Sequence, residues 1–253
     1  MKKIAAISSL AAFLTALAVP SYASSWAALH IPSAGEGESE SKSSKDEDEK
    51  PKKKGYAEEA VKHYNRGVEF HQNGSLNQAI AEYKAAIEAD GRLAEAYSNL
   101  GAVYLAQKSY TKAAEAFNKA LALKPDRPTT LNGLGNALYA RGQAAEAKDK
   151  WAKAIEIDPH FASAYYNMGN AFYQGNLFKQ AADAFRECIR YSPKDANAHN
   201  NLGLALMRLG DTDQAIDEWR EAVRLNPNLA QAHVNLGKAL SASQGFKPAG
   251  GSL

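Results

Sequence analysis

Asparagine recurs along this sequence at a fixed interval, with tyrosine nearby. Five asparagines lie 34 residues or a multiple of 34 residues apart: Asn65, Asn99, Asn167, Asn201 and Asn235. Position 133, occupied by glycine, belongs to the same series. Asn132 and Asn200 lie one residue before a position of the series, and Asn136 and Asn170 lie three residues after one. A primary amide offers one acceptor and two donor hydrogens, which match the C=O and N–H groups of a peptide unit. A regular row of amides can therefore hold an extended peptide by its backbone.

The sequence offers no comparable set of residues for catalysis or metal binding. His63, His199 and His233 share one place in the 34-residue interval, so they lie a whole interval or more apart, which disfavours a zinc site. The single cysteine, Cys188, takes a place where other copies have alanine, and it cannot form an internal disulfide. We find no nucleophile motif and no phosphate loop. We therefore expect a protein without enzymatic activity, bound metal or cofactor.

Composition and charge are those of an ordinary soluble protein. Apolar residues make up 45% of the 253 residues and charged residues 23%. The formal net charge of +2 comes from Lys2 and Lys3, and the remaining acidic and basic residues balance. Nucleic acid binding needs a concentrated basic face, so we do not expect it.

The same interval governs the apolar and turn residues. Glycine occupies one place in six copies: Gly67, Gly101, Gly135, Gly169, Gly203 and Gly237. An aromatic residue occupies another place in five copies: Tyr83, Phe117, Trp151, Phe185 and Trp219. Proline closes four copies, at Pro125, Pro159, Pro193 and Pro227. A 34-residue period with this pattern resembles the tetratricopeptide repeat (TPR), a helix–turn–helix unit.

The resemblance implies an all-α fold, a right-handed superhelix (α-solenoid) of five helix–turn–helix repeats plus a C-terminal capping helix. The repeats are expected at about residues 60–93, 94–127, 128–161, 162–195 and 196–229, within a repeat domain of residues 57–243. The capping helix is expected at residues 230–242 and a flexible tail at residues 244–253, which contains glycines and a proline. Each unit buries its apolar face on its neighbours, and the small glycine lets the second helix of a repeat approach the first.

Residues 1–23 have the three parts of a secretory signal peptide. Lys2 and Lys3 form a positive start, an apolar run follows over residues 4–19, and Ser21-Tyr22-Ala23 supplies small residues for cleavage. The alternative is a membrane anchor, but the run is shorter than the about 20 residues of a membrane span. We expect an exported protein, located in the periplasm or an equivalent lumen, or secreted.

Residues 24–56 are expected to form a disordered charged linker. Seven acids and six lysines lie between residues 33 and 55, with almost nothing apolar to bury. The acids come first and the basic cluster at residues 50–54 follows. A solvated spacer is the simplest interpretation. Any membrane contact is expected only through the basic cluster, which could touch anionic lipid.

The resemblance also implies where a partner binds, because TPR proteins use a concave groove lined by the first helix of each repeat. The asparagines described above fall on groove positions, as do four tyrosines and one histidine: Tyr64, Tyr139, Tyr166, Tyr173 and His71. The row is similar to the asparagine ladder of the nucleocytoplasmic sugar transferase that modifies serine and threonine. The alternative is that these amides bond within their own fold. We expect the groove amides to bind a peptide backbone, with the tyrosines covering its side chains. We also expect Asn167 and Asn201 to face solvent in the free protein.

Other TPR proteins capture a C-terminal carboxylate with lysine and arginine in the groove. Here Asn136 and Asn167 match the two asparagines of that clamp, but Asn132, Asn197 and Asn201 stand where its cations should be. We therefore do not expect this mode of binding.

The sequence thus predicts a non-catalytic scaffold or adaptor that binds an extended segment of a protein or peptide partner. Two alternatives stay open. One is a structural unit that associates with itself through the last helix, and the other is an accessory subunit of an envelope enzyme or of a membrane-complex assembly machinery. The identity of the partner and the oligomeric state do not follow from the sequence.

Overall fold

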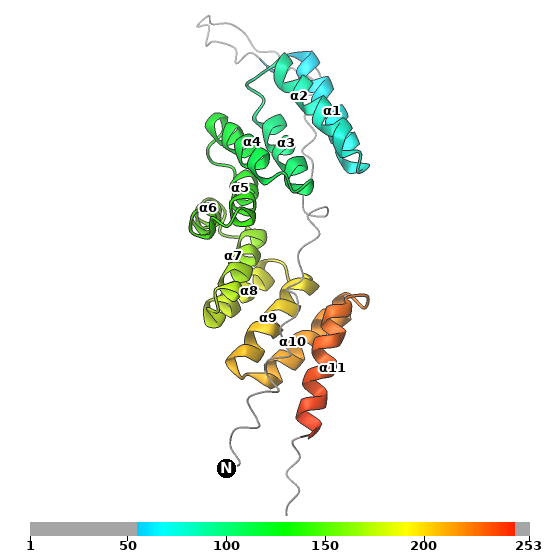
Figure 1. The fold of residues 1–253 in the computed structure, drawn as a ribbon, viewed down its shortest axis with the longest axis vertical. Coiled ribbons are helices and arrows are strands. Elements are labelled where there is room, and N and C mark those ends of the chain that lie inside the picture. The colour runs from blue at the N-terminus through cyan, green and yellow to red at the C-terminus, as the bar shows by residue number, and fades with distance from the viewer. Residues whose placement is uncertain (1–54, 246–253) are drawn as a thin grey trace, which may run out of the picture. The chain divides into compact units, whose positions relative to one another are not determined.

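The protein was analysed as a computed structural model, which describes residues 55–245 (Figure 1). The predicted signal peptide, the linker up to residue 54 and the tail from residue 246 lie outside the described residues. The described part divides into two compact units, Gly55–Pro159 and His160–Gly245, called here the N-terminal and C-terminal units. Within the described residues all regular structure is helical, which confirms the predicted all-α class.

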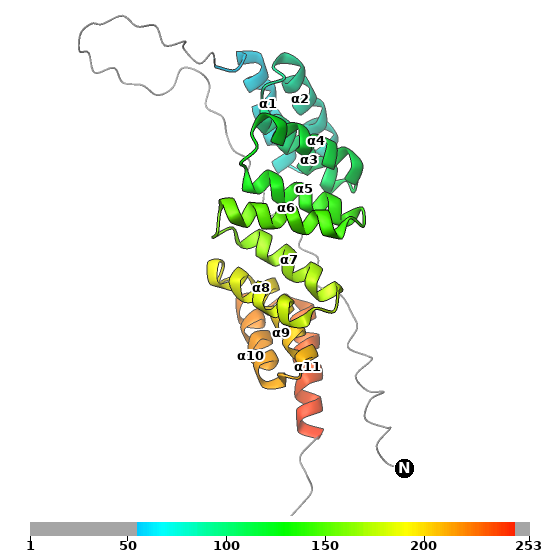
Figure 2. The same ribbon diagram turned by 90° about the vertical axis from the view of Figure 1, so that its left-hand side faces the viewer.

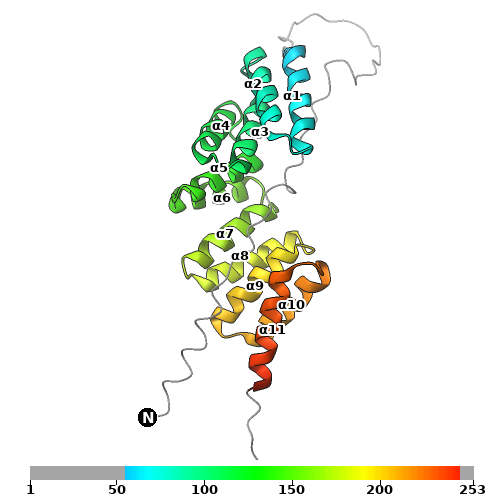
Figure 3. The ribbon, with the colours of Figure 1, turned by 45° about the vertical axis from the view of Figure 1, so that its right-hand side comes forward.

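The N-terminal unit contains three pairs of antiparallel helices, which Figure 3 shows side by side. The first helix of each pair is called helix A and the second helix B. The six helices are α1 (Glu58–Gln72), α2 (Leu76–Ala89), α3 (Ala94–Ala106), α4 (Tyr110–Leu123), α5 (Pro128–Ala140) and α6 (Ala144–Ile157).

The C-terminal unit contains two further pairs and a single last helix (Figure 2). Its helices are α7 (Ala162–Gln174), α8 (Phe178–Tyr191), α9 (Ala196–Leu209), α10 (Thr212–Leu225) and α11 (Ala230–Gly245). The helix α11 continues to Gly245, beyond the bound expected from the sequence. In the part of the chain that the structure describes, no helix is long and apolar enough to cross a bilayer.

Glycine on helix A receives the aromatic ring of helix B in all five pairs. A Cβ atom added to Gly169 would lie 2.6 Å from the Phe185 ring, and one added to Gly203 would lie 2.7 Å from Trp219. Real Cβ atoms do not approach that closely, so only glycine fits. The rings themselves are almost fully buried. This confirms that the glycines allow close helix packing.

The turn between helix A and helix B has the same shape in every pair. One residue in each turn has a positive φ: Gly74, Lys108, Gly142, Asn176 and Gly210. Glycine and asparagine tolerate this left-handed conformation best, whereas Lys108 adopts it at φ 58° against its intrinsic preference. The packing of the two helices therefore determines the turn geometry, whichever residue occupies the positive-φ position in a given repeat.

Candidate functional site

Hydrogen bonds join polar side chains of consecutive A helices. In the N-terminal unit, Asn99 Nδ2 on α3 donates to the Tyr64 hydroxyl on α1 at 3.0 Å. In the C-terminal unit, Asn201 Nδ2 on α9 donates to the Tyr166 hydroxyl on α7 at 3.1 Å, and Asn235 Nδ2 on α11 donates to Asn200 Oδ1 at 3.0 Å. In each pair the two residues are 35 positions apart. The recurring asparagines therefore connect one repeat to the next.

The link between α3 and α5 differs because Gly133 takes the place of the asparagine. Ser98 Oγ and Thr130 Oγ1 form a buried hydrogen bond of 3.0 Å instead. A polar contact between neighbouring A helices is thus kept even where the amide is missing.

Asn201 is the centre of this network in the C-terminal unit. Besides the Tyr166 hydroxyl, its Nδ2 donates to Asn170 Oδ1 at 2.9 Å, and its Oδ1 accepts from Asn200 Nδ2 at 3.0 Å. An amide has two donor hydrogens, so the donors of Asn201 are fully used within the fold. We call Tyr166, Asn170, Asn200, Asn201 and Asn235 the amide network.

The expectation that Asn167 and Asn201 face solvent is wrong for Asn201. Five of the predicted groove amides are buried: Asn132, Asn136, Asn200, Asn201 and Asn235. The physical reason is that neighbouring helices approach closely and use these amides as internal hydrogen-bond partners. Asn136 Oδ1, for example, accepts from Trp151 Nε1 at 3.1 Å, which satisfies the indole donor in the core of the N-terminal unit.

The remaining predicted contact residues are placed differently. Tyr64 and Tyr166 are buried, so their rings pack inside the units rather than covering a ligand. Seven residues are partly exposed: Asn65, His71, Asn99, Tyr139, Asn167, Asn170 and Tyr173. The first four belong to the N-terminal unit and the last three to α7 of the C-terminal unit. Among the predicted contact residues, these are the side chains that keep some exposed surface.

Burial keeps Tyr64 and Tyr166 protonated. It raises the pKa of Tyr64 to about 12, with a further contribution from the nearby charge of Glu95. Burial also raises the pKa of Tyr166, even though Asn170 and Asn201 hydrogen-bond its oxygen. Both hydroxyls therefore stay neutral near pH 7 and can accept from one asparagine while donating elsewhere.

His71, the one histidine among the predicted contacts, is half-buried on α1. Its ring meets Tyr83 edge-on, with 6.4 Å between the ring centroids. Burial lowers its pKa, so the neutral imidazole is favoured. The residue can offer a neutral hydrogen-bonding group but not a strong positive charge.

Apart from α1, which contains Glu58, Glu59, Lys62, Arg66 and Glu69, the A helices carry very little charge. Helices α5 and α7 contain no charged residue, and α9 and α11 contain no acid. In α3 the only charge is Glu95, whose Oε1 lies 2.7 Å from Lys124 Nζ and 2.5 Å from Arg127 Nη1. Burial opposes ionisation of Glu95, but the hydrogen bond from Lys124 and both cations outweigh it and lower its pKa. The face of these helices is polar but nearly neutral.

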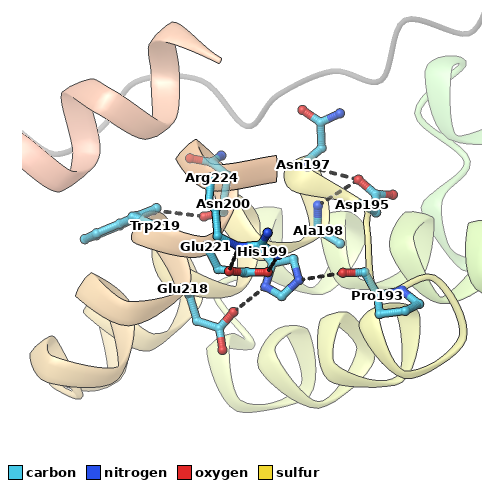
Figure 4. A network of polar contacts seen from close by, with 10 residues as sticks. All are labelled: Pro193, Asp195, Asn197, Ala198, His199, Asn200, Glu218, Trp219, Glu221 and Arg224. Carbon is cyan, nitrogen blue, oxygen red and sulfur yellow. Dashed lines mark hydrogen bonds and ion pairs between the residues drawn. The ribbon is translucent and has the colours of Figure 1, made fainter. Parts of the chain in front are cut away.

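Histidine and glutamate form a second recurring contact, which was not predicted from the sequence. His63 Nδ1 on α1 lies 2.6 Å from Glu82 Oε2 on α2, and His199 Nδ1 on α9 lies 2.7 Å from Glu218 Oε2 on α10. Figure 4 shows that the other nitrogen of His199, Nε2, meets the Pro193 carbonyl oxygen at 3.2 Å. In both pairs the histidine and the glutamate are 19 residues apart, and this equal spacing in the sequence could have predicted the contact.

The surroundings of His199 favour the charged form of its ring. Burial lowers its pKa, but the hydrogen bonds to Glu218 and the Pro193 carbonyl and the nearby charges of Glu218 and Glu221 outweigh burial, and the net shift is upward. A carbonyl and a carboxylate both act only as acceptors, so the geometry suits an imidazolium with two N–H donors.

Residues with metal-binding or nucleophilic chemistry do not converge. Within residues 55–245 there is no group of three or more histidine, cysteine, aspartate or glutamate side chains that could hold a metal ion. Cys188 is buried in the core of the C-terminal unit, and burial raises its pKa to about 12. Its thiol is therefore a packing group rather than a nucleophile.

Family models for the tetratricopeptide repeat match most of the described chain. Models described as "Tetratricopeptide repeat" match residues 94–127, 166–230 and 200–244, and one described as "TPR repeat" matches residues 67–108 and 135–176. A comparison with curated proteins gave no match.

Solved TPR-like structures share the fold. PilF of Pseudomonas aeruginosa has a TM-score of 0.62 and 19% identity, over 76% of this chain and 94% of that one. TTC0263, a TPR protein of Thermus thermophilus, has a TM-score of 0.60 and 16% identity, over 72% and 99%. YrrB, described as a TPR protein with an unusual peptide-binding site, has a TM-score of 0.54 and 23% identity, over 73% and 92%. At these identities the likeness concerns the fold alone.

Proposed function

The chain belongs to the tetratricopeptide repeat family, and we propose that it is a non-catalytic scaffold that binds an extended, uncharged segment of a protein partner. Proteins of this family act in general as scaffolds for protein or peptide partners. The binding surface proposed here is the A-helix face of the C-terminal unit, beside the amide network. We further propose that the protein is exported to the periplasm or an equivalent compartment.

The observation that carries the proposal is the combination of a rigid amide network with partly exposed amides next to it. Asn201 on α9 bonds to Tyr166 and Asn170 on α7, the helix that also carries Asn167. A prearranged polar surface loses little conformational entropy when a ligand binds. The amides Asn167 and Asn170 and the Tyr173 ring, all partly exposed, supply hydrogen bonds and aromatic area.

The charge pattern favours a neutral partner segment. Helix α7 has no charged residue, so an acidic or basic peptide would gain no ion pair from it. A peptide backbone, by contrast, needs donors and acceptors for its N–H and C=O groups once it leaves water. Side-chain amides provide both, which suits recognition of a backbone in an extended conformation.

The structural neighbour YrrB supports a peptide ligand in general terms. It shares the repeat fold and is described as having an unusual peptide-binding site. The position of that site is a property of YrrB. For this chain, the proposal depends on its own amides.

A peptide display selection on the full chain tests the proposal. Short random peptides should be enriched, and the selected sequences should be uncharged and should bind with little dependence on salt, because the contacts are neutral. Peptides should not bind when proline replaces their central residues, since proline removes a backbone N–H. A selection that enriches only acidic or basic peptides, or none, would contradict the proposal.

A further inference from the structure

We propose that α11 is the first half of a sixth helical pair and that its open face binds a partner helix with a defined sequence pattern. The open face is defined by His233, Val234 and Gly237, all exposed. The partner is an amphipathic helix with alanine, then glutamate three residues later, an aromatic residue four residues later and alanine seven residues later. This surface is separate from the amide network.

The packing of the helix A glycine against the aromatic ring of helix B is the first observation behind this proposal. In every complete pair, a Cβ atom added to the helix A glycine would meet the ring of helix B within 3 Å. The sixth glycine of the series is Gly237 on α11, and among the described residues nothing lies within 4 Å of a Cβ atom added there. The space that a ring fills in five pairs is therefore open in the sixth.

The histidine contact is the second observation. In the preceding pair, His199 Nε2 meets the carbonyl oxygen of Pro193, and its Nδ1 meets Glu218 (Figure 4). One repeat later, His233 Nε2 meets the carbonyl oxygen of Pro227 at 2.9 Å, so the ring is oriented in the same way. No contact of His233 Nδ1 with a carboxylate is found among the described residues. Among the described residues, His233 Nδ1 thus lacks the glutamate partner that His199 has in Glu218.

Both observations give the same partner sequence. In α2, Glu82 precedes Tyr83, with Ala79 and Ala86 on either side, and the pattern is Ala-x-x-Glu-aromatic-x-x-Ala. In α10 the same pattern is formed by Ala215, Glu218, Trp219 and Ala222. These are the two helices whose glutamates pair with a histidine of helix A. A helix that completes the α11 face must present both the carboxylate and the ring.

Helices α2 and α10 are already packed against their own A helices, so they do not provide this partner. Residues 246–253 contain no acidic residue, so they do not supply the pattern either. Val234, which is 46% exposed, adds apolar surface to the open face. Residues 1–54 do not contain the pattern either, so we assign the open face to a helix of another polypeptide that carries it.

A synthetic peptide with the sequence of residues 211–226 is a suitable probe, because it contains the pattern of α10. We expect the fluorescently labelled peptide to bind the full chain in an anisotropy titration. Peptides with W219A or E218Q should bind at least about tenfold more weakly, since each removes one of the two recognised groups.

The matched protein variant is Gly237→Leu, which fills the open space. Leucine is a better helix former than glycine, so α11 should keep its structure, and far-ultraviolet circular dichroism checks this. Peptide binding should fall at least about tenfold in this variant. The variant Lys84→Leu, which adds the same side chain at an exposed site of α2, should bind like the wild type.

Three results would overturn the proposal. The first is binding that Gly237→Leu leaves unchanged, or no binding by the wild type. The second is a wild-type dimer that Gly237→Leu abolishes in sedimentation experiments, which would assign the face to a second copy of the chain. The third is a chain ending at Gly245 that binds the peptide at least about tenfold more tightly, because the tail would then be the natural occupant.

Discussion

Asn201 on α9 donates a hydrogen bond to the Tyr166 hydroxyl on α7, and the two atoms are 3.1 Å apart. The same contact, at the same sequence separation, joins Asn99 to Tyr64 in the N-terminal unit. An amide that the sequence places in the binding groove is thus a connection between repeats. This structural role determines which asparagines can be changed to test binding and which will damage the fold.

Replacement of Asn201 should destabilise the C-terminal unit. Asn201→Ala leaves the Tyr166 hydroxyl, Asn170 Oδ1 and Asn200 Nδ2 without the partner that they have in the fold, so the free energy of unfolding should fall by about 1–3 kcal/mol. Urea unfolding followed by Trp219 fluorescence measures this change.

The matched control is Asn99→Ala, because Asn99 donates the same bond but is only partly buried. Its cost should be smaller, about 0.5–1.5 kcal/mol. An Asn201→Ala protein as stable as the wild type would show that the amide network does not stabilise the fold.

The packing of glycine against the aromatic ring predicts opposite effects on stability when glycine is changed to alanine at two sites of the C-terminal unit. Gly203→Ala places a Cβ atom 2.7 Å from the Trp219 indole, and such overpacking costs about 1–3 kcal/mol. Gly237→Ala meets nothing within 4 Å among the described residues, so the higher helix propensity of alanine should stabilise α11 by up to about 1 kcal/mol. Thermal unfolding of both variants provides the comparison, and equal destabilisation would contradict the account of α11.

The stability of the C-terminal unit should depend on pH through His199. Its pKa is raised in the folded state by Glu218, the Pro193 carbonyl and Glu221. The stabilisation is fully present below the ordinary histidine pKa of about 6.5 and is lost as pH rises through the raised value. Urea midpoints of the wild type should therefore fall between about pH 6 and about pH 8 more than those of His199→Gln.

The difference between wild type and His199→Gln is the informative quantity, because other groups titrate in both proteins. The charged groups that raise the pKa of His199 are Glu218 and Glu221 on α10, and Arg224 pairs with Glu221. If the two proteins show parallel pH profiles, His199 carries no additional proton in the folded state.

Export predicts a defined N-terminus for the mature protein. The apolar run and Ser21-Tyr22-Ala23 predict cleavage after Ala23, so Edman sequencing of protein from the producing cell should begin at Ser24. A change of Ala23 to a bulky residue should leave the uncleaved chain in the membrane fraction. Soluble cytosolic protein that retains Met1 would contradict export.

Much of the fold could be predicted from the sequence because its signals are local and repeated. Glycine, alanine and aromatic residues in register give the helix pairs, and the prolines after α4, α6, α8 and α10 give their ends. The burial of Asn201 could not be predicted from its own position. Its donors are taken by Tyr166 and Asn170 of the preceding repeat, and residue type alone does not say whether water or a neighbour accepts a hydrogen bond.

The open face of α11 was also outside the reach of position-by-position reasoning. His233 and Gly237 fit the repeat pattern, which predicted a capping helix. Only the packing distances show that the ring and carboxylate found against His199 and Gly203 have no counterpart here among the described residues. The open face is recognised when the contacts of Gly203 and His199 are compared with those of Gly237 and His233 one repeat later.

The affinity of a display-selected neutral peptide for Asn167→Ala tests the proposed peptide-binding surface most directly. Asn167 is partly exposed on α7 beside the amide network, and loss of one amide contact to a peptide backbone should weaken binding by about tenfold, or about 1.4 kcal/mol. The control Lys179→Ala, at an exposed site of α8, should bind like the wild type, and circular dichroism should show that all three proteins are folded. Wild-type affinity in Asn167→Ala, with the peptide bound and the fold intact, would place the partner on another surface.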